Sequence, residues 1–155
     1  MRKKMIAVLF LCVLFGACGG KVYRSYVYSF AGIENVKINV ELKNGYDLKN
    51  TLFDCYVTKD NKEILLIGLG DSSDLHDAQT LISAGKAEEL ENKNGKLVWK
   101  TEGKICSLSE VPGGISYLYT EGTISADTGE KDILDAMKYV SAETTLDDPS
   151  SYIEF

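Results

Sequence analysis

The amino-acid sequence predicts an α+β fold in which an antiparallel sheet carries two helices packed on one face. Segments of alternating apolar and polar residues predict several strands, most of them separated by short turns that contain Gly or Asn. Short turns indicate antiparallel neighbours, because parallel neighbours need a long crossover connection. Two segments with helical spacing interrupt the strands, so the predicted order is strands, helix, strands, helix.

The part of the chain before the first helix is predicted to form five strands. Residues 63–70, "EILLIGLG", are almost continuously apolar and predict a central strand buried on both faces. The loop 43–45 is predicted to close a bulged hairpin that places Leu42 opposite Tyr46. Its Gly45 supplies the left-handed conformation that such a turn needs. The five predicted strands are residues 22–30, 36–42, 46–49, 53–58 and 63–70.

The first helix is predicted to run from Ser73 to Ala84, with an extension to Leu90 left open. Asp71 and the two serines after it are strong N-cap residues. Asp74 suits the first turn, because the helix dipole favours a negative charge there. Three more strands are predicted after this helix, at residues 96–100, 104–108 and 115–124.

The second helix is predicted from a capping signal and an apolar stripe. Asp127 and Glu130 have the spacing of a capping box, with Asp127 as the N-cap. The last residues, 152–155, form either a final short strand or a tail. The stripe that would face the sheet consists of Ile133, Leu134, Met137, Val140 and Ser141.

The N-terminus, "MRKKMIAVLFLCVLFGACGG", has the layout of a secretory signal. A basic start is followed by an apolar run that is too short to span a bilayer, and then by small residues. The stretch before Cys18 resembles the lipobox of bacterial lipoproteins. The resemblance implies that the chain is cut between Ala17 and Cys18 and that Cys18 carries the lipid.

This resemblance divides the chain into a signal at residues 1–17, a tether at residues 18–21 and a single domain at residues 22–155. A lipid-bearing cysteine implies a protein anchored to a membrane on the extracytoplasmic side, because two or more acyl chains hold a protein firmly. Gly19 stands where such proteins carry an aspartate for inner-membrane retention. The resemblance therefore implies the outer membrane where the host has two membranes.

The charge of the domain excludes one class of partner. The 17 Lys and Arg of the chain include three in the signal, so residues 18–155 carry 14 of them against 23 Asp and Glu. This acidic excess disfavours nucleic acid, whose phosphates repel it. Membrane attachment is expected to come from the lipid anchor.

Two further cysteines, Cys55 and Cys106, remain in the domain. Outside the cytoplasm such a pair is a candidate disulfide, and the alternative is two separate buried thiols. The sequence has no closely spaced cysteine pair and a single histidine, His76. We therefore expect no metal site and no cofactor.

Three aromatic residues fall on one face of the first domain strand: Tyr26, Tyr28 and Phe30. An exposed row of this kind would bind sugar or peptide, whereas the alternative is ordinary packing within the sheet. His76 lies near Ser73 and Asp77, but no nucleophile-elbow motif surrounds the serine, so capping is the favoured role of this segment. The acidic spacing also does not match a calcium loop.

These observations favour a non-enzymatic binding or accessory module that acts on an envelope protein or glycan close to the membrane. One alternative is a lipoprotein that binds a small ligand or a glycan in a cleft between its tyrosine-rich strands. A second alternative is a small hydrolase whose site has no recognisable motif.

Overall fold

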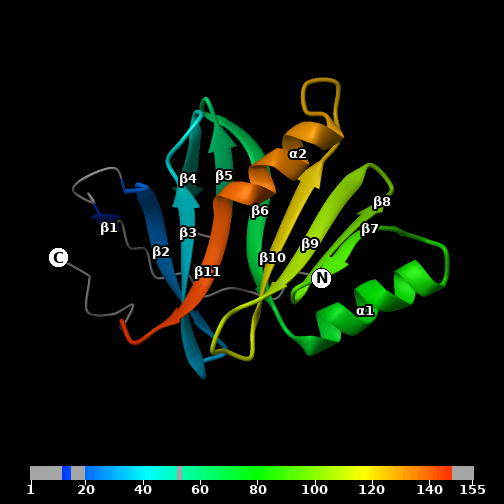
Figure 1. Cartoon of the computed structure of the whole chain (residues 1–155), viewed down its shortest axis with the longest axis horizontal. Helices are drawn as coiled ribbons and strands as arrows, with labels where there is room; N and C mark the ends of the chain where they lie inside the picture. The colour runs from blue at the N-terminus through cyan, green and yellow to red at the C-terminus, as the bar shows by residue number, and fades with distance from the viewer. Residues whose placement is uncertain (1–11, 15–19, 52–53, 148–155) are drawn as a thin grey trace.

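The computed structural model describes residues 12–14 (backbone), 20–51 and 54–147. These residues form two antiparallel sheets and two short helices (Figure 1). The elements are β1 (Cys12–Leu14), β2 (Tyr23–Phe30), β3 (Glu34–Glu41), β4 (Tyr46–Asn50), β5 (Cys55–Lys59), β6 (Lys62–Gly70), α1 (Ser72–Ser83), β7 (Glu88–Lys93), β8 (Lys96–Thr101), β9 (Lys104–Glu110), β10 (Tyr117–Thr123), α2 (Glu130–Ala136), a 3₁₀ turn at Met137–Tyr139 and β11 (Val140–Thr145). The mostly antiparallel architecture with two helices agrees with the predicted class.

The strands divide between a small sheet and a large one. The small sheet has the order β1-β2-β3-β11, and the large sheet has the order β4-β5-β6-β10-β9-β8-β7. Neighbouring strands are antiparallel throughout the described chain. The alternation of side chains in β3 fits this arrangement, because Val36, Ile38 and Val40 are fully buried while the residues between them are half-buried.

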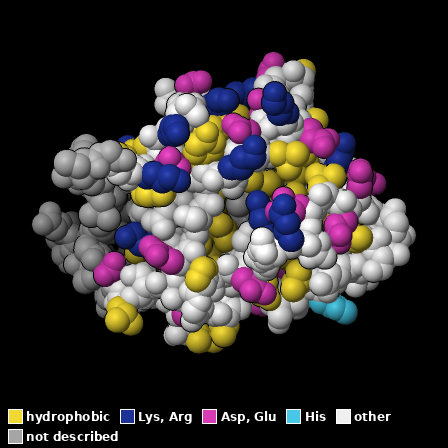
Figure 2. Space-filling model, in the orientation of Figure 1, with side chains coloured by type: hydrophobic (Ala, Val, Ile, Leu, Met, Phe, Trp, Pro, Cys, Tyr) yellow, Lys and Arg dark blue, Asp and Glu magenta, His cyan; other side chains and the backbone are white. Residues whose placement is uncertain are grey.

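The chain enters the domain at one end of β2, which we call the tether end. The Leu42 N–H donates to the Val22 carbonyl at 2.7 Å, and Lys21 forms an ion pair with Glu41 at 3.4 Å. The turns at residues 43–45 and 59–62 belong to the same end, because the Asp60 N–H donates to the Gly45 carbonyl. Charged side chains of both signs lie over this end, at the top of Figure 2.

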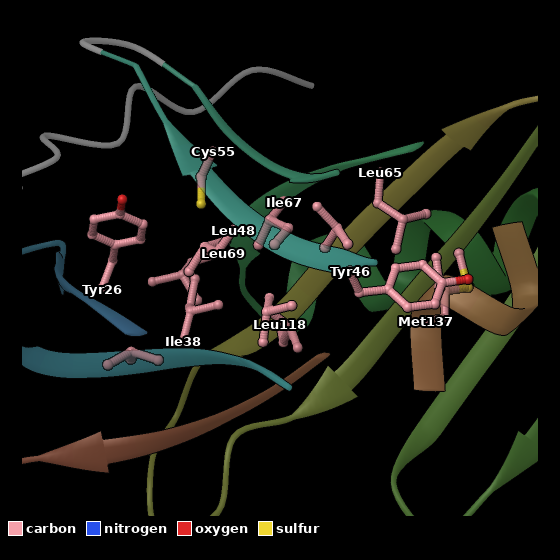
Figure 3. Packing of buried hydrophobic residues seen from close by; sticks show 14 of the residues in the cluster. Tyr26, Ile38, Tyr46, Leu48, Cys55, Leu65, Ile67, Leu69, Leu118 and Met137 are labelled. Carbon is pink, nitrogen blue, oxygen red and sulfur yellow. The ribbon is translucent and has the colours of Figure 1, made fainter. Parts of the chain in front are cut away.

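The main core lies between the two sheets (Figure 3). Ile38 comes from the small sheet, Leu48 and Ile67 come from the large sheet, and all three are at most 2 % exposed. The second helix joins this core through Ile133, which is fully buried against Gly122 of β10. One apolar cluster therefore binds both sheets and α2 together.

A second, smaller cluster lies on the opposite face of the large sheet. Ala78 of α1 packs there with Leu97, Trp99, Cys106 and Leu108. The helix α1 thus belongs to one face of the large sheet and α2 to the other. The prediction that both helices pack on one face is not confirmed.

The predicted hairpin at loop 43–45 is wrong. Gly45 has the expected left-handed backbone, with φ of +82°. However, β3 pairs with β2 and β11, whereas β4 pairs with β5. The turn therefore carries the chain from the small sheet to the large sheet instead of joining two paired strands.

The first helix is confirmed, but its open extension is not. Asp71 is the N-cap, and its side chain accepts hydrogen bonds from the N–H groups of Ser73 and Asp74. The helix ends at Ser83, and the following left-handed Gly85 stops it. Leu90 lies in the edge strand β7 and packs against the main core.

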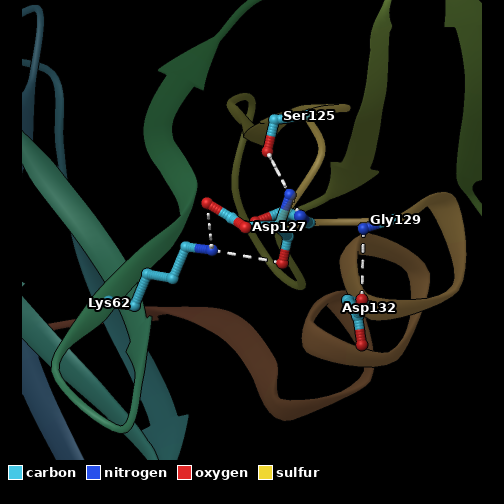
Figure 4. Close-up of polar contacts among 6 residues, drawn as sticks. Lys62, Ser125, Asp127, Gly129 and Asp132 are labelled. Carbon is cyan, nitrogen blue, oxygen red and sulfur yellow. Dashed lines mark hydrogen bonds and ion pairs between the residues drawn. The ribbon is translucent and has the colours of Figure 1, made fainter.

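The second helix begins later and ends earlier than predicted. Its N-cap is Gly129, whose N–H donates to the Asp132 carboxylate at 3.1 Å (Figure 4). Asp127 instead lies in the preceding loop, where its N–H donates to the Ser125 hydroxyl. Val140 and Ser141 belong to strand β11 and not to the helical stripe.

Strand β6 is central, as predicted, but only one of its two faces is fully buried. Leu65, Ile67 and Leu69 are buried in the main core. Leu66 and Gly68 point to the other face and are half-buried, because α1 covers only part of that face.

Candidate functional site

Ala17 and Cys18, the predicted cleavage and lipidation residues, lie outside the described residues. The structure does describe the last two residues of the predicted tether. Gly20 and Lys21 are exposed, and the next residue, Val22, accepts a backbone hydrogen bond from Leu42. Only residues 19–21 separate Cys18 from the folded sheet, a span of at most about 10–15 Å at ~3.5 Å per residue.

Cys55 and Cys106 are both buried free thiols, which agrees with the alternative of two separate thiols and not with the candidate disulfide. The strands β6 and β10 lie between β5 and β9, which places the two Cα atoms roughly 14 Å apart at ~4.8 Å per strand. A disulfide needs Cα atoms closer than about 7 Å. The two thiols also face opposite sides of the sheet, because they belong to different clusters.

The predicted aromatic surface is not formed either. Tyr26 is 7 % exposed and Tyr28 is 1 % exposed, and both pack in the main core. Phe30 is half-buried against the same core. The small sheet turns this face toward the large sheet, so the packing alternative explains the three residues.

The segment around His76 has a capping role. Ser73 donates its hydroxyl to the carboxylate of Asp71, and His76 is exposed on the surface of α1. No hydrogen bond of the described residues joins the serine to the histidine. The arrangement needed for a serine nucleophile and its base is therefore not assembled here.

A partly buried chain of polar groups lies on strands β9 and β10 of the large sheet. The Tyr119 hydroxyl lies 3.6 Å from the Cys106 sulfur and donates to Glu121 at 2.6 Å, and Glu121 forms an ion pair with Lys104 at 2.6 Å. Burial raises the pKa of Cys106 and of Tyr119. Burial also raises the pKa of Glu121, but hydrogen bonds from Lys104 and Tyr119 outweigh it and lower this pKa.

This chain of groups stabilises the sheet and does not prepare a nucleophile. A reactive cysteine needs a lowered pKa and access to solvent. Cys106 has a raised pKa and is only 4 % exposed. The ionised Glu121 instead accepts the hydrogen bond of the half-buried Tyr119 hydroxyl.

The described surface has a groove between α2 and strands β7 and β8, which we call the α2 groove. Its volume is about 560 Å³. Figure 2 shows hydrophobic side chains beside α2, with both signs of charge around them. The groove is lined by Glu91, Lys96, Val98, Glu130, Lys131, Leu134, Asp135, Met137 and Lys138.

The apolar part of the α2 groove continues into the main core. Val98 and Met137 are members of the core cluster, and Leu134 is half-buried against it. These side chains are held by the packing of α2 on the sheet, so the apolar floor is preformed. Methionine adapts its shape to a bound group more easily than branched residues do.

The charged rim of the groove is held by pairwise contacts. Glu130 forms an ion pair with Lys100 at 2.8 Å, and Asp135 forms one with Lys138 at 3.6 Å. Asp135 also accepts a hydrogen bond from the Tyr46 hydroxyl at 2.8 Å. Both signs of charge therefore surround an apolar floor, an arrangement suited to an amphipathic ligand or segment.

Among the described residues, no group of three or more His, Cys, Asp and Glu side chains is placed to hold a metal ion. The described helices are also too short to cross a membrane. Scans against protein-family models, curated proteins and solved structures return no match to this chain.

Sequence reasoning missed the α2 groove because its lining comes from three separate parts of the chain. A weak signal was present in α2, where Lys131, Leu134 and Lys138 recur at helical spacing beside the buried stripe. The partner strands β7 and β8 carry no matching signal, since their place beside α2 depends on the sheet order.

Proposed function

We propose that this chain is a lipid-anchored envelope lipoprotein, held through Cys18, whose domain binds a partner protein near the membrane without catalysing a reaction. The observation that carries the proposal is the short stretch of chain between Cys18 and Val22, which is hydrogen-bonded to β3's end through Leu42. Val22 is already fixed by Leu42, so the domain cannot extend away from its anchor. Such a domain works at the membrane surface.

The α2 groove supports binding of a protein segment. Its apolar floor offers Val98, Leu134 and Met137, and its rim offers charges of both signs that orient a bound chain. Amphipathic segments of partner proteins bind to grooves of this kind. The aromatic surface expected for glycan binding is not exposed, because Tyr26 and Tyr28 are buried.

A small ligand is the second candidate for the same groove. Ligand pockets commonly enclose roughly 300–1,000 Å³, and the α2 groove lies within this range at about 560 Å³. Its lining then predicts a ligand with an apolar body and a charged or zwitterionic end.

The test is photo-crosslinking in the native envelope. A photoreactive side chain replaces Lys131, which is exposed in the groove, and Gln79, which is exposed on α1, serves as the matched control. We expect a discrete protein adduct from position 131 and none from position 79. In a Cys18→Ser background the protein should leave the membrane fraction and the adduct should disappear.

Three outcomes would count against the proposal. The same adducts from both positions would show that the groove has no special role. A Cys18→Ser protein that stays in the membrane fraction would refute the lipid anchor. Absence of any adduct, together with a ligand-dependent rise in melting temperature, would favour the second candidate.

A further inference from the structure

The outer edge of strand β2 is paired with a segment of the predicted signal. Strand β1 runs antiparallel to β2, and its three residues stand opposite Tyr23, Arg24 and Ser25. Cleavage before Cys18, as proposed above, removes β1 from the mature chain. The edge of β2 then loses the strand that pairs with it in the described part of the chain.

The backbone groups on this edge belong to every second residue of β2. The Leu42 N–H donates to the Val22 carbonyl, so the even-numbered residues of β2 exchange their hydrogen bonds with β3. A row of N–H and C=O groups on a sheet edge is a template for a further strand. The residues that direct these groups toward the edge are Tyr23, Ser25, Val27 and Ser29.

The edge of β2 lacks the features that protect the edge of the large sheet. Strand β7 carries three glutamates and a bulge between Glu89 and Glu91, and both features discourage a further strand. Strand β2 pairs with β3 over eight residues without a bulge. Its single charged side chain, Arg24, forms an ion pair with Asp47 at 2.6 Å. An edge of this length and composition is suited to accept another strand.

The last described residue, Asp147, lies one strand away from β2. Its carbonyl accepts a hydrogen bond from the Asn35 side chain at 3.1 Å, and Asn35 of β3 stands opposite Ser29 of β2. Strands β11 and β2 both pair antiparallel with β3, so they run in the same direction. A chain that turns back after Asp147 would therefore run antiparallel to β2, as β1 does.

Residues 148–155 have the length and the pattern for this edge. The edge lies about 10 Å from β3 at ~4.8 Å per strand, a distance that residues 148–150 span at ~3.5 Å per residue. Pro149 suits the turn, because it has no N–H to donate to a sheet. Residues 152–155, predicted as a final strand or a tail, lie outside the described residues, and their sequence "YIEF" alternates apolar Ile153 and Phe155 with Glu154.

We propose that residues 151–155 form the last antiparallel strand of the small sheet in the mature protein, on the edge of β2 that β1 occupies in the precursor. The inference rests on the signal cleavage proposed above. The crossing distance and the alternation place Tyr152 opposite Ser29. Ile153 then stands opposite Tyr28, on the face that meets the main core. The signal segment and the C-terminal segment thus use one edge in turn.

Disulfide trapping tests the pairing and its register. The pair Ser29→Cys/Tyr152→Cys is introduced into the lipidated protein, which is oxidised in detergent at low concentration. We expect an intramolecular disulfide, because opposite residues of such strands have Cα atoms about 5.5 Å apart. The matched pair Ser29→Cys/Ile153→Cys moves one thiol to the other face of the sheet and should form the bond roughly fivefold less. Peptide mapping by mass spectrometry identifies the bonded thiols.

Amide hydrogen exchange measures the same contact without added cysteines. The backbone N–H of Val27 faces the edge, whereas the N–H of Tyr28 is directed toward β3. Removal of residues 151–155 should speed exchange at Val27 by roughly tenfold or more and leave exchange at Tyr28 unchanged. Faster exchange at Tyr28 as well would show that the truncation unfolds the sheet, and the disulfide yields then decide.

Equal disulfide yields from the two cysteine pairs, or slow exchange at Val27 that persists in the truncated chain, would overturn the C-terminal strand. A disulfide-linked dimer through position 29 would assign the edge to a second copy of the chain instead. Intact mass is recorded on every sample. A chain that keeps residues 1–17 refutes the proposed signal cleavage, whereas a processed chain that fails these tests refutes only the C-terminal strand.

Discussion

At the scale of single residues, burial keeps the thiols of Cys55 and Cys106 protonated and apart. Each thiol fills an apolar site, and the sheet separates them by two strands. Burial raises the pKa of Cys55 from 9.0 to about 12, against a smaller opposing effect of the Tyr28 hydroxyl. The protonated thiol is therefore the native form at any physiological pH.

Native Cys55 and Cys106 should not react with a thiol reagent such as DTNB at pH 8, because thiolate is the nucleophile and both groups are buried. In denaturant the same sample should release two equivalents. The unfolded thiol has a pKa of about 8.5. The free energy of unfolding should therefore fall as pH rises from about 9 toward 12, because the unfolded chain then binds fewer protons. A native sample without free thiols in denaturant would show that they are bonded.

The sequence predicted which residues share one face of a strand, but it did not predict what that face contacts. The pattern placed Tyr26 and Tyr28 on one face, and they do share a face. Whether that face meets water depends on a second layer that belongs to distant strands. Period-two alternation cannot distinguish a face covered by another sheet from a face that binds a ligand.

At the scale of the elements, the contact between α2 and β10 depends on the absence of one side chain. A Cβ atom at Gly122 would lie 2.5 Å from Ile133, whereas a Cβ at Gly68 of the neighbouring strand would lie 3.7 Å from Tyr119. The first distance is too short for real atoms and the second is ordinary contact. Gly122 therefore lets α2 approach the sheet.

Gly122→Ala should destabilise the domain by about 1–3 kcal/mol, because the added methyl group overpacks the interface with α2. The matched control Gly68→Ala should change stability little. Urea unfolding followed by circular dichroism measures both variants. Equal stability of the two variants would contradict the close packing of α2 on β10.

The sequence predicted those helices and strands whose signals, such as a capping residue, lie within the element itself. The first helix could be found because Asp71 caps it within its own turn. Strands β7 and β11 could not, since "EELENK" is polar and Val140 also fits a helical stripe. Their strand form depends on pairing with β8 and with β3, which lies about a hundred residues earlier.

At the scale of the whole molecule, the main core makes both sheets depend on each other. Ile38 of the small sheet is fully buried among residues of the large sheet (Figure 3). Trp99 lies in the other cluster, on the opposite face of the same large sheet. Because both clusters pack on this sheet, loss of packing between the two sheets should also change the fluorescence of Trp99.

Ile38→Ala should lower the free energy of unfolding by about 2–5 kcal/mol, as large-to-small changes in a core do. The Trp99 fluorescence transition should shift together with the far-ultraviolet circular dichroism transition. Ile33→Ala, at a position 71 % exposed, is the matched control and should change little. Separate transitions for the two signals would show that the sheets unfold independently.

The fold class could be predicted because turn residues and apolar–polar alternation are features of short stretches of sequence. The α2 groove could not be predicted in this way. Its floor joins Val98 with Leu134 and Met137, which come together only when α2 crosses the face opposite α1. The sequence contains no local feature that fixes this crossing. The lipidation residue, in contrast, is predicted from a contiguous stretch, because an enzyme would read it before the chain folds.

The short span between Cys18 and Val22 has a consequence for affinity. A domain confined to a layer about as thin as its tether meets other membrane-bound proteins by diffusion in a plane. Confinement of this kind raises the effective concentration toward the millimolar range. The α2 groove can then work with contacts too weak to hold a partner free in solution, and an occupant would be exchanged quickly. Under the proposed anchoring, the tether would set which membrane proteins the domain meets, and the α2 groove would select among them.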